Sequence, residues 1–300
     1  MDNSSVRDIL KSVLTENLIF ENEPMSKHTT FRAGGNAAFY VTPESEEQIV
    51  ALVRALKGTK YMFMGNGSNL LFTDKGYDGV VVEIGSRYSQ ITVEGNNIIA
   101  ESGALLSKVA NVALEHGLGG MEFAAGIPGS IGGAVVMNAG AYGGEMKDIV
   151  SLSICVDEKG NVFEVEDHEF SYRHSIFSHK NLLVLKTVLR LQPKNKDEIK
   201  AEMVELNKRR KDKQPLEYPS AGSTFKRPEG YFAGKLVEDA GLKGYRVGGA
   251  MVSEKHAGFV INYDNATATD ILNLMEHIKS EVYMRFGVEL EAEVKIVGEE

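Results

Sequence analysis

Nine glycines lie between Gly119 and Glu145, and this segment constrains the fold more than any other part of the chain. They are Gly119, Gly120, Gly126, Gly129, Gly132, Gly133, Gly140, Gly143 and Gly144. Glycine weakens helices and strands, so this density is typical of backbone that must approach another group closely. Apolar residues such as Ile131 and Val135 separate the glycines, and no lysine or arginine occurs in the segment. We interpret it as a buried ligand cradle. Its amides near 129–131, where a short helix could begin, would bind a phosphate or pyrophosphate. A glycine-rich hairpin packed into the core is the alternative.

Composition limits the kind of protein this can be. A length of 300 residues predicts about two domains, and a net charge of −9 argues against a general nucleic-acid binder. The single cysteine, Cys155, cannot form an intramolecular disulfide and lies in a strand-like apolar run, so we expect a core thiol in a reducing compartment. No apolar run approaches the ~18 residues of a membrane span, and no basic-then-apolar leader is visible. We expect a soluble cytoplasmic protein without a metal site, a membrane or nucleic-acid partner, or an obligatory protein partner.

A second glycine turn, Gly65-Asn66-Gly67-Ser68-Asn69-Leu70, follows a predicted strand at 61–64. The third glycine of the Rossmann fingerprint is missing, and an apolar run replaces the helix that should follow, so the segment does not match this fingerprint. Neither glycine segment ends in Gly-Lys-Ser or Gly-Lys-Thr, which excludes a Walker loop. We expect a strand-to-strand turn whose amides and polar side chains bind an anion. The two glycine segments would then hold the two ends of one pyrophosphate.

The predicted elements form an α+β pattern without a βαβ repeat. Helices are expected at 6–14, 43–57, 105–116, 196–213, 231–240 and 267–286. Strands are expected at 38–41, 61–64, 80–84, 90–93, 97–101, 149–156, 161–165, 182–191, 258–263 and 288–297. We expect these strands to pair locally. The proline- and glycine-rich chain after Pro215 indicates a domain boundary there.

Two basic segments allow two interpretations each. The helix predicted at 196–213 ends in Lys208-Arg209-Arg210-Lys211-Asp212-Lys213, which is either a solvated face or a set of cations that neutralises phosphates. His28 and Arg32 likewise either face a phosphate or solvate a loop.

Three residues could carry chemistry. The planar guanidinium of Arg173 can bind both oxygens of a carboxylate. Ser223 follows Gly222 but lacks the second glycine of a hydrolase nucleophile elbow. A serine that acts as a proton donor would instead need to be held rigidly beside a developing carbanion. Glu293 alternates with Glu291 along the predicted final strand, so both would point to one face. The structural alternatives are a surface ion pair for Arg173, a turn cap for Ser223 and a solvated position for Glu293.

Seven motifs, taken together and in this order, resemble one family over essentially the whole chain. They are His28-Thr29-Thr30-Phe31-Arg32-Ala33-Gly34-Gly35, Gly65-Asn66-Gly67-Ser68-Asn69-Leu70, Ala125-Gly126-Ile127-Pro128-Gly129-Ser130-Ile131-Gly132-Gly133, Asn138-Ala139-Gly140-Ala141-Tyr142-Gly143, Ser171-Tyr172-Arg173, Ala221-Gly222-Ser223-Thr224-Phe225 and Glu293-Val294. The chain resembles the MurB family of UDP-N-acetylenolpyruvoylglucosamine reductases, flavoenzymes of bacterial cell-wall precursor synthesis. It is similar to the shorter form of the family, which lacks an inserted tyrosine-bearing loop.

The resemblance implies an α+β, PCMH-type FAD-binding fold of two subdomains, 1–84 and 85–214. An α+β substrate-binding domain, 215–300, would follow, with its final strand returning toward the flavin site. Non-covalent FAD and the co-substrate NADPH are implied. The implied cofactor-binding residues are Gly65, Asn66, Gly67, Ser68, Asn69, Leu70, Gly126, Gly129, Ser130, Gly132, Gly133, Asn138, Gly140 and Arg210. The implied substrate-binding residues are Tyr172, Lys213 and Arg227.

The implied reaction passes a hydride from NADPH through FAD to the enolpyruvyl ether of UDP-N-acetylglucosamine, giving UDP-N-acetylmuramate. Arg173 and Glu293 would stabilise the enolate-like species, and Ser223 would protonate it. For Glu293 to donate a hydrogen bond, burial and neighbouring negative charge should raise its pKa. A flavin oxidase of the same fold and a non-catalytic nucleotide-sugar-binding protein are the alternatives.

Overall fold

The computed structural model describes residues 3–299, which form two compact units. The first unit contains the residues up to Glu21, Phe39–Asn66 and Gly79–Arg210. The second contains Asn22–Ala38, Gly67–Asp78 and the residues from Lys211 onward. Each unit therefore combines segments that are distant in the sequence.

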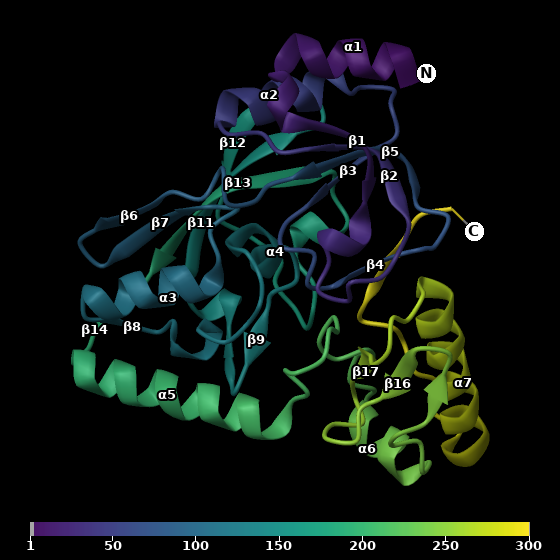
Figure 1. Cartoon of the computed structure of the whole chain (residues 1–300). Helices are drawn as coiled ribbons and strands as arrows, with labels where there is room; N and C mark the ends of the chain where they lie inside the picture. The colour runs from purple at the N-terminus through teal and green to yellow at the C-terminus, as the bar shows by residue number, and fades with distance from the viewer. Residues whose placement is uncertain (1–2, 300) are drawn as a thin grey trace. The chain divides into compact units, whose positions relative to one another are not determined.

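The first unit is built on two sheets (Figure 1). The larger, in the antiparallel order β12-β11-β13-β7-β6, contains β6 (Ile91–Glu94), β7 (Asn97–Glu101), β11 (Val150–Asp157), β12 (Val162–Val165) and β13 (Leu182–Arg190). The other, in the order β1-β2-β5-β3, contains β1 (Ile19–Pro24), β2 (Asn36–Val41), β3 (Tyr61–Met64) and β5 (Tyr77–Glu83), and the unit boundaries fall within β1, β2 and β5. The short pairs are β8 (Leu118–Gly119) with β14 (Gln192–Pro193) and β9 (Gly140–Ala141) with β10 (Gly144–Glu145).

Apolar helix faces complete the core of the first unit. Its helices are α1 (Asn3–Val13), α2 (Glu46–Ala55), α3 (Leu106–Glu115), α4 (Ile131–Val136) and most of α5 (Lys196–Lys213). Val109 of α3, Ile131 of α4 and the i, i+4 pair Ile199 and Met203 of α5 share one core with the larger sheet. Cys155 is buried in this core, as predicted, and burial raises the pKa of its thiol to about 12.

The second unit packs two helices on a small antiparallel sheet. α6 (Ala233–Asp239) and α7 (Ala268–Phe286) accompany the sheet β15-β16-β17, which contains β15 (Arg246–Val247), β16 (Ala250–Val252) and β17 (Val260–Asn262). β4 (Leu70–Phe72) pairs in parallel with β18 (Lys295–Val297). As predicted, α7 begins at the capping box of Thr267 and Asp270 and ends at Gly287, whose φ of 66° is left-handed.

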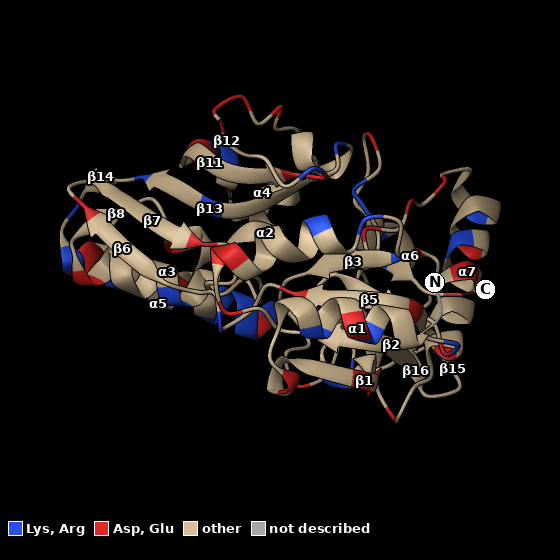
Figure 2. Ribbon diagram, turned by 90° about the horizontal axis from the view of Figure 1, so that it is seen from above, with Lys and Arg blue, Asp and Glu red and all other residues tan. Residues whose placement is uncertain are grey.

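Charged side chains lie along both α5 and α7 (Figure 2). On α7, Ile271, Leu274, Ile278 and Val282 are buried at helical spacing, so its charges lie on the opposite face. No helix among residues 3–299 is both long and apolar enough to cross a lipid bilayer.

The prediction of local strand pairing is wrong for several pairs, including β2 with β5 and β8 with β14. β7 pairs with β13, with Ala100 opposite Thr187, and β4 pairs with β18, with Leu71 opposite Ile296. Strand partners are chosen by the faces that they bury together, and a local pattern does not contain this information.

The predicted final strand at 288–297 is also wrong in extent. Only β18 is regular, and Ala292 forms an isolated bridge with Phe225, so Glu291 and Glu293 do not lie in a continuous strand. The helix predicted from residue 231 begins at Ala233, because Phe232 has an extended backbone.

Asp74 binds the N-terminus of α7. Its carboxylate accepts hydrogen bonds from the amides of Ala268 at 2.9 Å and Thr269 at 2.7 Å, and from the Thr269 hydroxyl at 2.6 Å. Burial acts to raise the pKa of Asp74, but these hydrogen bonds outweigh burial, and the pKa is lowered.

We expect Asp74→Asn to lower the free energy of unfolding at neutral pH by about 1 kcal/mol. Because the folded pKa is lowered, the stabilisation by Asp74 is complete above the unfolded pKa and is lost as pH falls through the folded pKa. The variant should therefore lose less stability than the parent between about pH 7 and about pH 3, as measured by urea denaturation. The control is Asp78→Asn, at an exposed position of β5. Parallel pH curves for Asp74→Asn and the parent would contradict this role.

Candidate functional site

Two glycine turns lie against each other in the first unit. Asn66, after β3, donates from Nδ2 to the Pro128 carbonyl at 2.9 Å. A Cβ atom at Gly65 would lie 2.3 Å from the Ser130 Oγ, so a side chain there would displace this hydroxyl. The two segments that the sequence indicated separately therefore form one structure, which we call the glycine cradle (residues 65–66 and 126–133).

Two amides at the start of α4 donate to carbonyl groups of the chain itself, and one of them, Ile131, lies in the range 129–131 that was predicted to bind an anion. The Ile131 amide donates to the Ala104 carbonyl, and the Gly132 amide donates to the Ser102 carbonyl, both at 2.8 Å. The Ile131 amide is therefore not available to a phosphate, whereas phosphate binding by the rest of the range 129–131 stays a prediction. Both amides bind carbonyl groups of the turn at 102–104, because a buried carbonyl group needs a hydrogen-bond donor.

Buried hydroxyls provide the cradle with other donors. Among residues 3–299, the Oγ atoms of Ser130 and Ser102 are buried without a hydrogen-bond partner. Leaving a buried polar atom unpaired costs about 1–3 kcal/mol, so these positions are suited to an acceptor supplied by a ligand. The Ser130 hydroxyl, beside Gly65, fits a phosphate or carbonyl oxygen of a bound cofactor.

The end of α5 packs on the cradle at Gly126. A Cβ atom at Gly126 would lie 2.5 Å from the Asn207 Oδ1 and 3.1 Å from the Arg210 Cδ. Burial lowers the pKa of Arg210. A partly buried guanidinium beside a glycine turn can bind an anionic ligand, so at Arg210 the basic helix end is more than a solvated face.

A hydrogen-bonded group surrounds the turn that carries Arg173. Asn138 donates from Nδ2 to the Ser171 carbonyl at 3.0 Å and to the Glu145 carboxylate at 3.1 Å. Gly140, predicted to lie near the cofactor, packs on Glu145: a Cβ atom there would lie 2.7 Å from the Glu145 Cγ. The sequence analysis did not select Glu145, although an acid directly after two glycines was a possible signal.

The second unit brings Ser223 close to Glu293. The Glu293 amide donates to the carbonyl of Thr224, the residue after Ser223, at 2.9 Å. Asn69, from the second glycine turn, donates from Nδ2 to the Glu293 carbonyl at 3.1 Å. Ser223 is exposed, whereas Glu293 is half-buried. Arg173 belongs to the first unit, so the meeting of Arg173 with Ser223 and Glu293 stays a prediction.

The turn at 28–32 contacts the same glycine turn. Thr30 donates from its amide to the Gly67 carbonyl at 3.2 Å. Within the described chain, the Oγ1 atoms of Thr29 and Thr30 are buried without a partner, and the sequence analysis did not select either hydroxyl. The His28 Nε2 lies 3.0 Å from the Glu23 carboxylate, which favours an internal role for His28 over phosphate binding.

The predicted substrate-binding residues are exposed. The Tyr172 ring lies 5.1 Å from the guanidinium carbon of Arg173, and the guanidinium of Arg227 lies 3.9 Å from the Phe232 ring. Lys213 is the last residue of α5.

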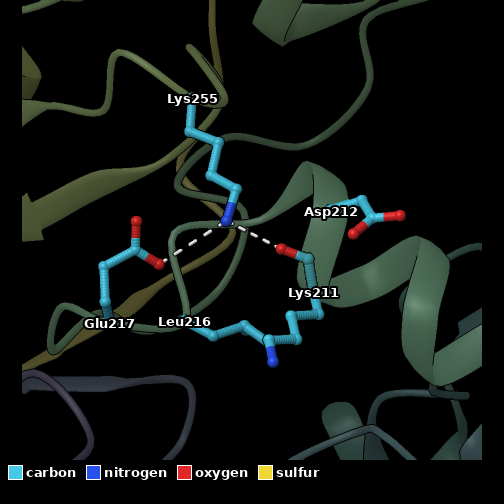
Figure 3. Close-up of a pocket in the computed structure, with 5 residues that line it drawn as sticks. All are labelled: Lys211, Asp212, Leu216, Glu217 and Lys255. Carbon is cyan, nitrogen blue, oxygen red and sulfur yellow. Dashed lines mark hydrogen bonds and ion pairs between the residues drawn. The ribbon is translucent and has the colours of Figure 1, made fainter.

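A hollow of about 650 Å³ lies at the end of α5 in the second unit (Figure 3). It is lined by Lys211, Asp212, Leu216, Glu217 and Lys255. The Lys255 Nζ donates to the Lys211 carbonyl at 2.7 Å and lies 3.6 Å from the Glu217 carboxylate. A cation on the last carbonyls stabilises a helix end, so Lys255 holds the turn that carries Lys213.

No group of three or more His, Cys, Asp or Glu residues within 3–299 is arranged to hold a metal ion.

Comparison with known proteins first defines the class. A family model for an FAD-binding domain matches residues 37–166, and a model for the C-terminal domain of UDP-N-acetylenolpyruvoylglucosamine reductase matches residues 214–297. A structure of a Phl p 4 variant, a glucose oxidase, shares the fold at a TM-score of 0.51 and 13% identity, covering 64% of this chain and 44% of its own. The protein is therefore an FAD-dependent oxidoreductase with an α+β, PCMH-type domain followed by a C-terminal domain.

Closer relatives identify the family. The UDP-N-acetylenolpyruvoylglucosamine reductase of Caldanaerobacter subterraneus subsp. tengcongensis is 55% identical over 296 residues, which cover 97% of this chain and 98% of that protein. The enzyme of the same name from Clostridioides difficile is 49% identical over the full length of both chains. A crystal structure of the Thermus caldophilus reductase (MurB) matches at a TM-score of 0.80 and 33% identity, covering 93% of this chain and 97% of that one. The chain belongs to the UDP-N-acetylenolpyruvoylglucosamine reductase family, which confirms the resemblance seen in the sequence.

Two neighbouring glycines of α4 provide a test of the cradle. Gly133→Ala should raise the free energy of unfolding of the apoprotein by about 0.5–1 kcal/mol. Its Cβ atom would meet only the Ser130 Oγ, at 3.6 Å, and alanine favours a helix. Gly132→Ala should instead lower this free energy, because its Cβ atom would lie 2.7 Å from the Ser102 Cβ. Chemical denaturation of both variants measures the difference. Equal effects would show that the 102–104 turn does not constrain α4.

Proposed function

We propose that this protein reduces the enolpyruvyl ether of UDP-N-acetylglucosamine enolpyruvate to UDP-N-acetylmuramate, with NADPH as the reductant, in peptidoglycan precursor synthesis. The main support is the 55% identity to the Caldanaerobacter reductase over almost the whole length of both chains. The glycine cradle, with its unpaired Ser130 hydroxyl, supports the cofactor part of the proposal.

We propose that FAD binds non-covalently to the two glycine turns and to the residues around them. The chain residues assigned to it are Gly65, Asn66, Gly67, Ser68, Asn69, Leu70, Gly126, Gly129, Ser130, Gly132, Gly133, Gly140 and Arg210. Asn138, which the resemblance also implied, is not assigned to FAD here, because its side chain is hydrogen-bonded to Ser171, Glu145 and Lys147. When bound, FAD would accept a hydride from NADPH and deliver it to the terminal carbon of the enolpyruvyl group. The hydroxyl of Ser130 and the guanidinium of Arg210 have the donor chemistry to hold its anionic and carbonyl oxygens.

Three side chains would handle the charge that the hydride creates. Addition to the terminal CH2 carbon makes a methyl group and moves negative charge from the neighbouring carbon into the carboxylate. Arg173 binds this carboxylate with both arms of its guanidinium, and Glu293 donates a hydrogen bond to it. Such placed donors are each worth roughly 3–4 kcal/mol in the transition state. Ser223 completes the reaction by giving its hydroxyl proton to the neighbouring carbon.

The remaining assignments concern the substrate and the setting. Lys213 would bind the diphosphate, and Tyr172 and Arg227 would contact other parts of the sugar nucleotide. The functional domains would be two FAD-binding subdomains, 1–84 and 85–214, and a substrate-binding domain, 215–300. We propose a cytoplasmic location, since a single cysteine suits a reducing compartment.

Visible spectra of the purified holoprotein test the whole proposal. We expect a flavin spectrum that bleaches anaerobically with NADPH and returns when the enolpyruvyl substrate is added. A flavin that is reoxidised by oxygen but not by this substrate would favour an oxidase. A colourless protein that binds the UDP-sugar but no FAD would favour a binding protein without chemistry.

Ser223→Ala should separate the two half-reactions. Flavin reduction by NADPH should stay within about twofold of the parent, because no proton donor is needed there. Reoxidation by the enolpyruvyl substrate should slow by about 10²- to 10⁴-fold, the usual contribution of a positioned proton donor. Stopped-flow absorbance measures both steps, and Ser220→Ala, in the same segment, is the control. Equal slowing of both steps would contradict proton donation by Ser223.

A further inference from the structure

The turn that carries Arg173 has a backbone that needs support. Arg173 has a φ of 54°, in the left-handed region that residues other than glycine rarely adopt. Ser171 and His174 exchange backbone hydrogen bonds at 3.1 and 3.2 Å, so Tyr172 and Arg173 form the tip of a tight turn. Nothing in the local sequence favours this conformation, because the turn contains no glycine, asparagine or aspartate.

One buried side chain meets this turn from the glycine-rich segment. Asn138 is fully buried and itself has a left-handed φ of 42°. Its Nδ2 donates both hydrogens, to the Ser171 carbonyl at 3.0 Å and to the Glu145 carboxylate at 3.1 Å. Its Oδ1 accepts from the Lys147 amide at 3.0 Å. Both polar atoms of the Asn138 side chain are therefore hydrogen-bonded to other groups of the protein.

The partners of Asn138 connect it to the guanidinium as well as to the backbone. The Glu145 carboxylate forms an ion pair with Lys147 at 2.7 Å, and this contact, more than any other, lowers the pKa of Glu145. The positive charge of Arg173 acts on the same carboxylate. Asn138 thus holds both the Ser171 carbonyl, two residues before Arg173, and a carboxylate that attracts the Arg173 side chain.

The other end of the same loop is anchored separately. The hydroxyls of Ser175 and Ser178 donate to the Val136 carbonyl at 2.8 and 2.9 Å. These two bonds hold the chain after the turn. Asn138 holds the chain before it, through the Ser171 carbonyl.

We propose that Asn138 is a positioning residue that fixes the direction of the Arg173 guanidinium, and that it acts through Arg173 on the substrate-reduction step. This inference rests on the proposed function. Asparagine suits the position chemically. Aspartate would place a carboxylate against the Ser171 carbonyl and the Glu145 carboxylate, and glycine would keep the left-handed backbone but remove both donors.

The test uses the holoenzyme variants Asn138→Asp and Asn138→Gly. If one variant does not fold, the other still tests the inference. We expect reoxidation by the enolpyruvyl substrate to slow by about 10- to 100-fold, because small misplacements of a clamp have effects of this size. Flavin reduction by NADPH and FAD content should stay within about twofold of the parent. Amide hydrogen exchange, followed by mass spectrometry, should become at least about tenfold faster in residues 170–175 and stay unchanged in the second unit.

A double-mutant cycle with Arg173→Ala distinguishes positioning from general structural support. If Asn138 acts through Arg173, Asn138→Asp should slow reoxidation by less than about twofold in the Arg173→Ala background. Asn265→Asp is the matched control, since Asn265 is exposed and has a similar φ of 49°. This variant should leave both half-reactions and the exchange of residues 170–175 unchanged.

Two results would overturn the inference. Full additivity in the cycle would show that Asn138 does not act through Arg173. Loss of FAD from both Asn138 variants, with normal exchange of residues 170–175, would place its role at the cofactor. If parent holoenzyme is not reoxidised by the enolpyruvyl substrate, the proposed function fails instead, and the exchange measurement still tests the contact between Asn138 and the turn.

Discussion

The close approach of two glycine turns is the constraint on which the first unit depends. The Asn66 side-chain amide reaches the Pro128 carbonyl, and beside it Gly65 leaves room for the Ser130 hydroxyl, which a Cβ atom there would meet at 2.3 Å. The position of the second turn determines where α4 begins, and the first amides of α4 hold the 102–104 turn between β7 and α3. The cradle and the five-stranded sheet are therefore parts of one hydrogen-bonded structure.

This arrangement changes how the glycine-rich segment should be understood. Its amides at Ile131 and Gly132 are structural, whereas the buried hydroxyls of Ser102 and Ser130 have no hydrogen-bond partner within the described chain. A hydroxyl can rotate and can donate or accept, while an amide N–H only donates in a fixed direction. The second unit shows the same division at the turn of residues 28–32, where the Thr30 amide binds the Gly67 carbonyl and the Thr29 and Thr30 hydroxyls are unpaired within the described chain. Glycine here allows close packing, and the neighbouring serines and threonines provide the polar chemistry.

The candidate functional residues belong to backbone segments that hydrogen bonds from other parts of the chain hold in place. Arg173 and Asn138 both have left-handed conformations, and hydrogen bonds from Asn138 connect their segments. Lys255 holds the end of α5 that carries Lys213, and the chain around Thr224 holds Glu293. Unfavourable conformations at functional sites persist when several contacts maintain them, and each of these segments has such contacts.

Local patterns in the sequence were sufficient for most elements and for the family. The helix at 196–213, the strand at 61–64 and the capping box at Thr267 follow from periodicity and end signals that act within a few residues. The sequence also indicated both glycine turns, Ser223 and Glu293 as candidates. Only the tertiary structure decided that β4 pairs with β18, that the α4 amides are occupied and that Asn138 binds the turn of Arg173. These outcomes depend on which distant groups are buried together, because a buried donor must find an acceptor wherever the packed chain provides one, and no local pattern records that partner.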